Sequence, residues 1–118
     1  MGVYLTTTVS PAMLSPEGRP NMTITELAKP EFAELVAAKR DLIIPAVGHQ
    51  NTATILESKF GLNSLFAQVS PLLRDGDTIL VAIPLFRADA IRELSTAEIR
   101  SARFRYFVAT VGLGKGAA

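Results

Sequence analysis

The sequence holds one histidine, at position 49, and histidine is the residue type best suited to moving a proton near neutral pH. It lies in Val47-Gly48-His49-Gln50-Asn51-Thr52, between an apolar run and a stretch with helical spacing. A helix that begins here leaves unpaired backbone N–H groups and a partial positive charge, which together bind anions and phosphates. Gly48 lets a ligand approach the backbone. The motif predicts a phosphate site with a general acid or base, although such a histidine can equally be a helix cap or a solvent contact.

Two further places carry phosphate-binding chemistry. Arg87 follows the most strand-like stretch of the chain, and a guanidinium binds phosphate through two parallel N–H groups. The alternative is a surface arginine paired with Asp89 or Glu93. Ser10, with the threonines at 6–8, places hydroxyls where a first strand ends. They can donate to phosphate or sugar oxygens, or they are ordinary polar positions on a half-exposed strand.

The sequence offers few of the residues that thiol, metal or nucleic-acid sites require. The chain has no cysteine and one histidine, which excludes thiol nucleophiles, zinc–thiolate sites and two-histidine metal motifs within one chain. Asp75 and Asp77 resemble part of a calcium loop, but the remaining ligands are missing, so a turn is expected. Arg100, Arg103 and Arg105 alternate with aromatic residues. They could stack on nucleic acid, but an edge strand with one charged face explains them better.

The elements that must position these residues follow from spacing and punctuation. Helices are expected over residues 29–40 and 51–60, the second ending at Gly61, and a capping box at Ser95 and Glu98 begins a third. Arg74-Asp75-Gly76-Asp77 is typical of a hairpin turn. Pro84 ends the strand before it or marks that strand as an edge. Strands are expected over residues 3–9, 21–24, 42–47, 65–70, 78–83 and 103–111.

This order predicts a small α/β (α+β) domain over residues 1–111, with a mixed sheet of about five strands flanked by helices and a flexible tail over 112–118. Apolar residues make up 48% of the 118 positions and the mean hydropathy is +0.29. This apolar content is high for a small chain and suggests that some of the surface is buried in an oligomer, most simply a twofold dimer. A tightly packed monomer is the alternative. The formal net charge of +1 does not favour binding along nucleic acid.

No signal peptide and no apolar run of about 18 residues is recognisable, so a cytoplasmic protein without membrane contact is expected.

Four parts of the chain resemble the viral type III anti-CRISPR ring nucleases and related cellular CRISPR-associated ring nucleases. They are the opening Val3-Tyr4-Leu5 with Ser10 and Ala12-Met13-Leu14, the Gly48-His49 junction with its helix, residues 73–83, and Phe86-Arg87 followed by residues 94–99. The most specific part is Ala46-Val47-Gly48-His49-Gln50-Asn51-Thr52-Ala53, close to the family signature Ser-Ile-Gly-His-x-Ser/Thr-Thr-Ala.

The resemblance implies a homodimer that binds cyclic tetra-adenylate across its twofold axis. Such enzymes cut the ring, without metal or cofactor, into linear di-adenylates ending in a 2′,3′-cyclic phosphate, and so switch off type III CRISPR signalling. The substrate's own 2′-hydroxyl is the nucleophile. The family's histidine falls on His49, which is expected to protonate the leaving 5′-oxygen, and its arginine falls on Arg87, which is expected to hold the phosphate.

Contacts to the ligand are then expected from Ser10, Val47, Gly48, Gln50, Asn51, Gln68 and Asp89. Three positions depart from the family pattern. Its acidic residue falls on Ala90, with Asp89 one position short, its middle-strand basic residue falls on the neutral Gln68, and its first-loop asparagine falls on Ala12. The loss of the acidic residue and of the middle-strand basic residue favours one alternative, a protein that binds the cyclic nucleotide without cutting it. Because a fold does not dictate a function, a structural or interaction protein of viral or mobile-element origin is a second alternative.

Overall fold

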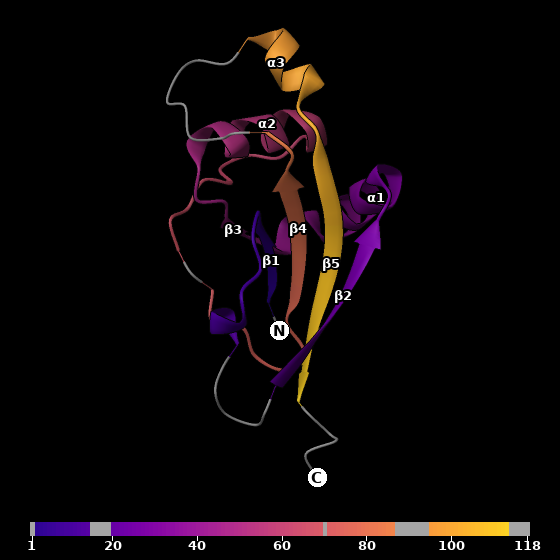
Figure 1. Cartoon of the computed structure of the whole chain (residues 1–118), viewed down its shortest axis with the longest axis vertical. Helices are drawn as coiled ribbons and strands as arrows, with labels where there is room; N and C mark the ends of the chain where they lie inside the picture. Colours follow the sequence, from indigo (N-terminus) through magenta and orange to yellow (C-terminus); the bar gives the residue numbers. More distant parts are fainter. Residues whose placement is uncertain (1, 15–19, 70, 87–94, 114–118) are drawn as a thin grey trace.

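A computed structural model describes residues 2–14, 20–69, 71–86 and 95–113 of the chain. Its described elements alternate between strands and helices and build one five-stranded mixed sheet (Figure 1). In chain order they are β1 Val3–Thr6, the 3₁₀ turn η1 Pro11–Met13, β2 Pro20–Leu27, α1 Lys29–Lys39, the 3₁₀ turn η2 Arg40–Leu42, β3 Ile43–Ala46, α2 Gln50–Phe60, β4 Thr78–Pro84, α3 Thr96–Ser101 and β5 Phe104–Leu113. The expected fold class, α+β with five strands, is confirmed.

The strand order is β2-β5-β4-β1-β3. β1 pairs in parallel with both β3 and β4, and its last residue, Thr6, lies between Ala46 and Val81. β5 pairs antiparallel with β4 on one side and β2 on the other. Three parallel strands therefore end at the same edge of the sheet, which is where open α/β sheets place their ligands.

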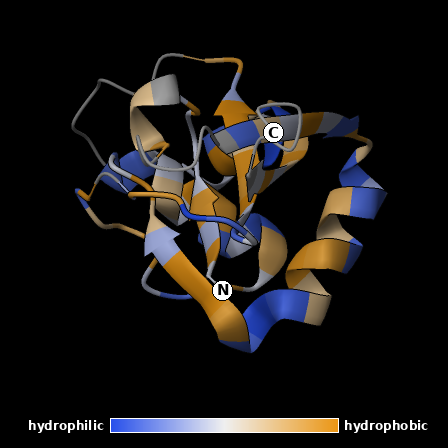
Figure 2. Cartoon of the chain, turned by 90° about the horizontal axis from the view of Figure 1, so that it is seen from below, coloured by the Kyte–Doolittle hydropathy of each residue, from blue (hydrophilic) through white to orange (hydrophobic). Residues whose placement is uncertain are grey.

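The helices α1 and α2 cover one face of the sheet. Phe32 of α1 and Leu56 of α2 are fully buried and pack with Leu5 and Leu80 in one hydrophobic core. An aromatic cluster at this interface brings Phe32 within 4.6 Å of Tyr106, measured between ring centroids. In the view along the long axis, apolar strand segments gather at the centre, while α1 alternates apolar and polar residues along its length (Figure 2).

The opposite face of the sheet is covered by irregular chain. Leu73 is fully buried there against Ile79, Val81 and Ala109, with Met13 and Leu14 packed around it. The Leu73 N–H donates to the Met13 carbonyl at 2.6 Å, and Leu14 and Leu73 form an isolated parallel bridge. This layer is thinner than the helical one, since Ile24, Ile44 and Ile83 remain exposed on the strands.

Several predicted boundaries are confirmed. The Ser95–Glu98 capping box is present, with Ser95 Oγ accepting from the Glu98 N–H at 3.1 Å. Gly61 ends α2 in the left-handed conformation, with φ of 65°. Asp75 and Gly76 form the expected turn, and the Asp77 carboxylate is buried there as an acceptor for backbone N–H groups rather than as a cation ligand. Pro84 is the last residue of β4.

Five predictions about the strands were wrong. Residues 65–70 form no strand among the described residues: Phe66 makes one bridge to Val47, and Pro71 brings no N–H to extend a ladder. The turn at Asp75 therefore closes no hairpin. β1 stops at Thr6 instead of residue 9, because the chain bends at Thr7, and β2 is twice as long as residues 21–24, because it pairs with β5 throughout.

The fifth error concerns β5, which is an inner strand between β2 and β4 rather than an edge. The arginine at position 105 is accounted for by its neighbour in the sheet: Arg105 forms a bidentate ion pair with Glu26 on β2, at 2.9 and 2.8 Å. β5 also continues through Gly112 and Leu113, which pair with Asn21 and Pro20. The rest of the predicted tail lies outside the described residues.

Candidate functional site

The Gly48-His49 junction lies where β3 ends and α2 begins, at the carboxyl edge of the parallel strands. Val47 anchors it. Its side chain is fully buried, its N–H donates to the Leu65 carbonyl at 3.2 Å, and its carbonyl accepts from the Ala67 N–H at 2.9 Å. Val47 therefore uses its side chain and both backbone groups to hold the junction in place.

His49 is the N-cap residue of α2, with extended backbone angles and an exposed side chain. Its carbonyl accepts the first helical hydrogen bond, from Ala53 at 2.9 Å, but its side chain makes no capping bond. The first turn of α2 also contains no acidic residue. The imidazole is thus not used as a cap, and the positive end of the helix is not offset by a carboxylate of its own first turn.

Gly48 borders open space. A Cβ built at this position meets no atom within 4 Å, and the glycines with positive φ are Gly61 and Gly76 among the described residues. Neither backbone conformation nor crowding within the chain therefore requires glycine at position 48. The space beside its backbone is available to a ligand.

The first turn of α2 supplies polar groups of different availability. The exposed Gln50 reaches Thr54 Oγ1 through Nε2 at 3.4 Å, while Asn51 is half-buried and has an interaction partner. Thr52 is fully buried, and its Oγ1 is the one buried side-chain atom without a hydrogen-bond partner in the described part of the chain. Thr52 belongs to the segment predicted to bind phosphate, but the sequence assigned it no role of its own.

Gln68 lies beside the junction on a loop that backbone hydrogen bonds fasten there, and not on the predicted strand. It follows Ala67, whose N–H donates to Val47, and its side chain is exposed. Two apolar side chains on the same part of the loop are also exposed, by 41% at Phe66 and 57% at Val69. Leu72, which is 51% exposed, lies farther along the loop, next to the residue that is bonded to Met13 of η1. The junction is therefore bordered by a polar side chain and by uncovered apolar surface.

Ser10 lies apart from the junction. After β1 the chain turns back, so that η1 lies toward the opposite end of the molecule from α2 (Figure 1). Ser10 begins this turn: its Oγ accepts from the Ala12 N–H at 3.2 Å and its carbonyl from the Met13 N–H at 3.0 Å. That bond uses the hydroxyl as an acceptor and leaves its proton to donate.

Arg87, Asp89, Ala90 and Glu93 lie outside the described residues, so the predicted phosphate-holding arginine and its acidic partner stay predictions. β4 directs the chain toward the carboxyl edge as far as Phe86, whose ring packs edge-on against Phe104 with centroids 5.3 Å apart. Within the described ranges, no three His, Asp or Glu residues come together as cation ligands. No described helix has the length and apolar character needed to cross a membrane.

Neither the protein-family models nor the curated protein sequences contain a match to this chain. Among solved structures, the chain is similar to B116 of Sulfolobus turreted icosahedral virus, with a TM-score of 0.76 and 22% sequence identity. The alignment covers 93% of this chain and 99% of the viral protein. At this identity the likeness establishes the fold, and a viral protein therefore has the same architecture over nearly its whole length.

Proposed function

We propose that this protein is a ring nuclease that binds a cyclic oligoadenylate, cyclic tetra-adenylate in the first instance, and cuts it using the substrate's own 2′-hydroxyl. The observation that carries the proposal is the exposed His49 side chain at an uncapped helix N-terminus, beside the open backbone of Gly48. This arrangement offers backbone N–H groups and a helix dipole to a phosphate and one proton donor next to it. The resemblance in the same segment supplies the substrate class.

The reaction needs few groups from the protein. The 2′-oxygen attacks the adjacent phosphorus and its proton passes to solvent, while the bond between phosphorus and the 5′-oxygen breaks. His49, as imidazolium, gives its proton to that leaving oxygen, and the products end in a 2′,3′-cyclic phosphate and a 5′-hydroxyl. The α2 N–H groups and Arg87 stabilise the charge that develops on the phosphate oxygens.

The working unit in this proposal is a twofold dimer. One histidine per chain becomes two, one for each of two opposed phosphates in a symmetric ring. The second copy packs on the exposed apolar side chains of Phe66 and Val69, on the loop beside the junction.

The central experiment incubates the protein with cyclic tri-, tetra- and hexa-adenylate in the presence of a chelator and separates the products. Linear di-adenylate with cyclic phosphate ends is expected from the tetra-adenylate ring. His49→Ala should abolish cleavage and retain the thermal stabilisation that the ring produces. Cleavage by His49→Ala at the parental rate would remove the proposed role of the histidine.

The dimer is tested by light scattering on Val69→Asp, which places a charge on the apolar loop. The matched control is Leu42→Asp, a substitution at a side chain that is 62% exposed on η2, at the amino end of β3. Val69→Asp is expected to give monomers with reduced cleavage, and Leu42→Asp to remain dimeric. Equal masses for the two variants would place the interface elsewhere.

A second candidate function is a binding protein that holds the ring without cutting it. The neutral Gln68 beside the junction favours it, because a missing positive charge there weakens stabilisation of the transition state. Thermal stabilisation by the ring without formation of linear product identifies this function. No thermal shift with any of the three rings would favour a structural or interaction protein instead.

A further inference from the structure

A basic pocket lies at the other end of α2 from His49. Its volume is about 420 Å³, within the range of small-molecule sites, and its lining comes from α1, α2, α3, β5 and the segment after β4. Lys29 begins α1, Lys59 lies near the end of α2, Leu85 follows β4, and Arg103, Phe104 and Tyr106 belong to the start of β5 or precede it. Lys59 lies ten positions after His49, so the two sites are roughly 15 Å apart along α2.

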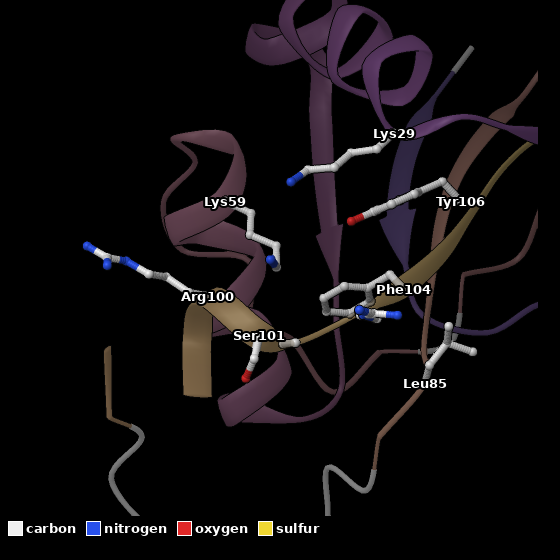
Figure 3. A pocket seen from close by; sticks show the side chains of 9 residues that line it. Lys29, Lys59, Leu85, Arg100, Ser101, Phe104 and Tyr106 are labelled. Atoms are coloured by element: carbon white, nitrogen blue, oxygen red, sulfur yellow. The ribbon is translucent and has the colours of Figure 1, made fainter. Parts of the chain in front are cut away.

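The polar ends of three side chains converge in this pocket. Figure 3 shows the ammonium groups of Lys29 and Lys59 and the hydroxyl of Tyr106 directed into the same space, while the guanidinium of Arg100 points away. Arg103 adds a further cation to the lining, and its carbonyl accepts from the Leu85 N–H at 2.9 Å, which fixes the floor of the pocket.

In the part of the chain that the structure describes, no acidic side chain neutralises the two lysines. Neither lysine has an ion-pair partner among the described residues. The ion pair that these residues do form joins Arg105 of β5 to Glu26 of β2, outside the pocket lining. Burial lowers the pKa of Lys59, and the positive charge of Lys29 lowers it further. Burial raises the pKa of Tyr106, which keeps its hydroxyl protonated as a donor. A small anion would relieve the repulsion between the two ammonium groups and accept hydrogen bonds from all these donors at once.

We propose that this pocket binds a small anion with two linked phosphates, either free pyrophosphate or the diphosphate of a nucleotide. A single phosphate reaches fewer of the donors spread over a cavity of about 420 Å³, whereas a diphosphate bridges Lys29 and Lys59. Leu85 and Phe104 supply an apolar wall where a nucleoside fits. The site does not depend on the cleavage chemistry at His49.

Calorimetric titration of the whole protein with pyrophosphate, ADP and adenosine at low ionic strength tests the proposal. Pyrophosphate and ADP should bind and adenosine should not; tighter binding of ADP identifies a nucleotide as the ligand, and equal binding identifies the diphosphate alone. Lys59→Gln and Lys29→Gln should each weaken binding about tenfold. Lys39→Gln, the same change at the far end of α1, should leave it within twofold.

His49→Ala should bind pyrophosphate as the unaltered protein does, which separates this site from the proposed nuclease centre. Thermal melts of each variant show that a loss of affinity is not a loss of folding, and Tyr106→Phe provides a second variant that removes one donor. Three results overturn the proposal: no binding at millimolar pyrophosphate, affinity unchanged in both lysine variants, or tight binding of a single-stranded RNA that the same variants abolish. The last would identify a nucleic-acid surface instead.

Discussion

The N–H of Ala67 donates to the carbonyl of Val47 at 2.9 Å, so the loop that bears Gln68 is fastened beside the Gly48-His49 junction. Residues about twenty positions apart in sequence are thereby neighbours at the edge of the sheet. The bond extends the sheet by one isolated bridge, Val47 to Phe66, and no further. The loop is therefore positioned by the backbone at its start, and its exposed side chains beyond Ala67 are free to meet a ligand or a second copy of the chain.

Gln68→Lys is expected to raise affinity for the cyclic ligand about tenfold, because it adds a positive charge next to the helix N-terminus that receives the phosphate. Titration of the unaltered protein and the variant with cyclic tetra-adenylate measures the change. Asn63→Lys adds the same charge to an exposed position on the preceding loop segment and should change affinity less than threefold. Equal gains in both variants would indicate general attraction of an anion rather than a contact at Gln68.

Gly48→Ala is expected to fold with unchanged or slightly higher stability and to lose ligand affinity. The free chain has room for the methyl group, and an alanine loses less backbone entropy on folding than a glycine. A ligand that lies against the Gly48 backbone meets that methyl group directly. Thermal melts and ligand titration together check both halves of the prediction.

The control for that variant is Gly61→Ala, because Gly61 has φ of 65° as the residue that ends α2. Forcing alanine into this conformation should cost about 1 kcal/mol of unfolding free energy. A Gly48→Ala variant as destabilised as Gly61→Ala would show that position 48 needs glycine for folding.

The Arg105–Glu26 pair makes stability depend on pH in the acid range. Its hydrogen bond and charge lower the pKa of Glu26 below the ordinary 4.5. A carboxyl with a lowered pKa in the folded state stabilises the protein fully above the unfolded pKa, and that stabilisation is lost as pH falls through the folded pKa. Glu26→Gln should therefore flatten the decline in melting temperature below pH 4.5, while Glu34→Gln, at an exposed position on α1, should not.

The helices could be predicted from sequence because their signals are local. Gly61, the Ser95–Glu98 box and the spacing of Phe32 and Val36 act within one or two turns, so no distant residue is needed to interpret them. The junction at His49 was equally visible, since an apolar run, a glycine and a helical stretch follow one another directly.

Strand neighbours could not be predicted in this way. The alternation of Arg103 and Arg105 is typical of an exposed edge, yet β5 is an inner strand whose charge is met by Glu26, 79 residues away. Residues 65–70 have strand-like composition, but of the described positions 65–69 only Phe66 forms a bridge to the sheet. Whether an apolar run becomes a strand depends on an unpaired neighbouring edge, which composition does not report.

The basic pocket was likewise beyond sequence reasoning. Lys29, Lys59 and Arg103 stand in three separate segments with ordinary surface patterns, and only the packing of α1 and α2 against β5 brings them to one cavity.

Asp77→Ala is expected to lower the unfolding free energy by about 3 kcal/mol. Its buried carboxylate accepts from the Gly2 N–H through Oδ1 and from the Arg74 N–H through Oδ2, each at 2.8 Å, so removal leaves two donors unsatisfied. Asp77→Asn keeps one acceptor oxygen and should cost roughly half as much. Urea denaturation gives both values, and a loss no larger than that of Asp41→Ala, at an exposed position on η2, would contradict the role assigned to the carboxylate.

Thr52→Val is expected to stabilise the protein. The Thr52 hydroxyl is fully buried in the first turn of α2 without a hydrogen-bond partner, and replacing it by a methyl group of similar size removes the cost of desolvating it. The gain should be about 1 kcal/mol, or roughly 4 °C in melting temperature. Thr54→Val, two positions along, is the matched control: its hydroxyl is exposed and donates to the Gln50 carbonyl at 3.0 Å, so no gain is expected.

A Thr52→Val variant that melts lower than the unaltered protein would mean that the hydroxyl has a partner in solution. If that variant melts higher but cleaves more slowly, the buried Thr52 hydroxyl destabilises the fold and contributes to the activity of the site at the helix start.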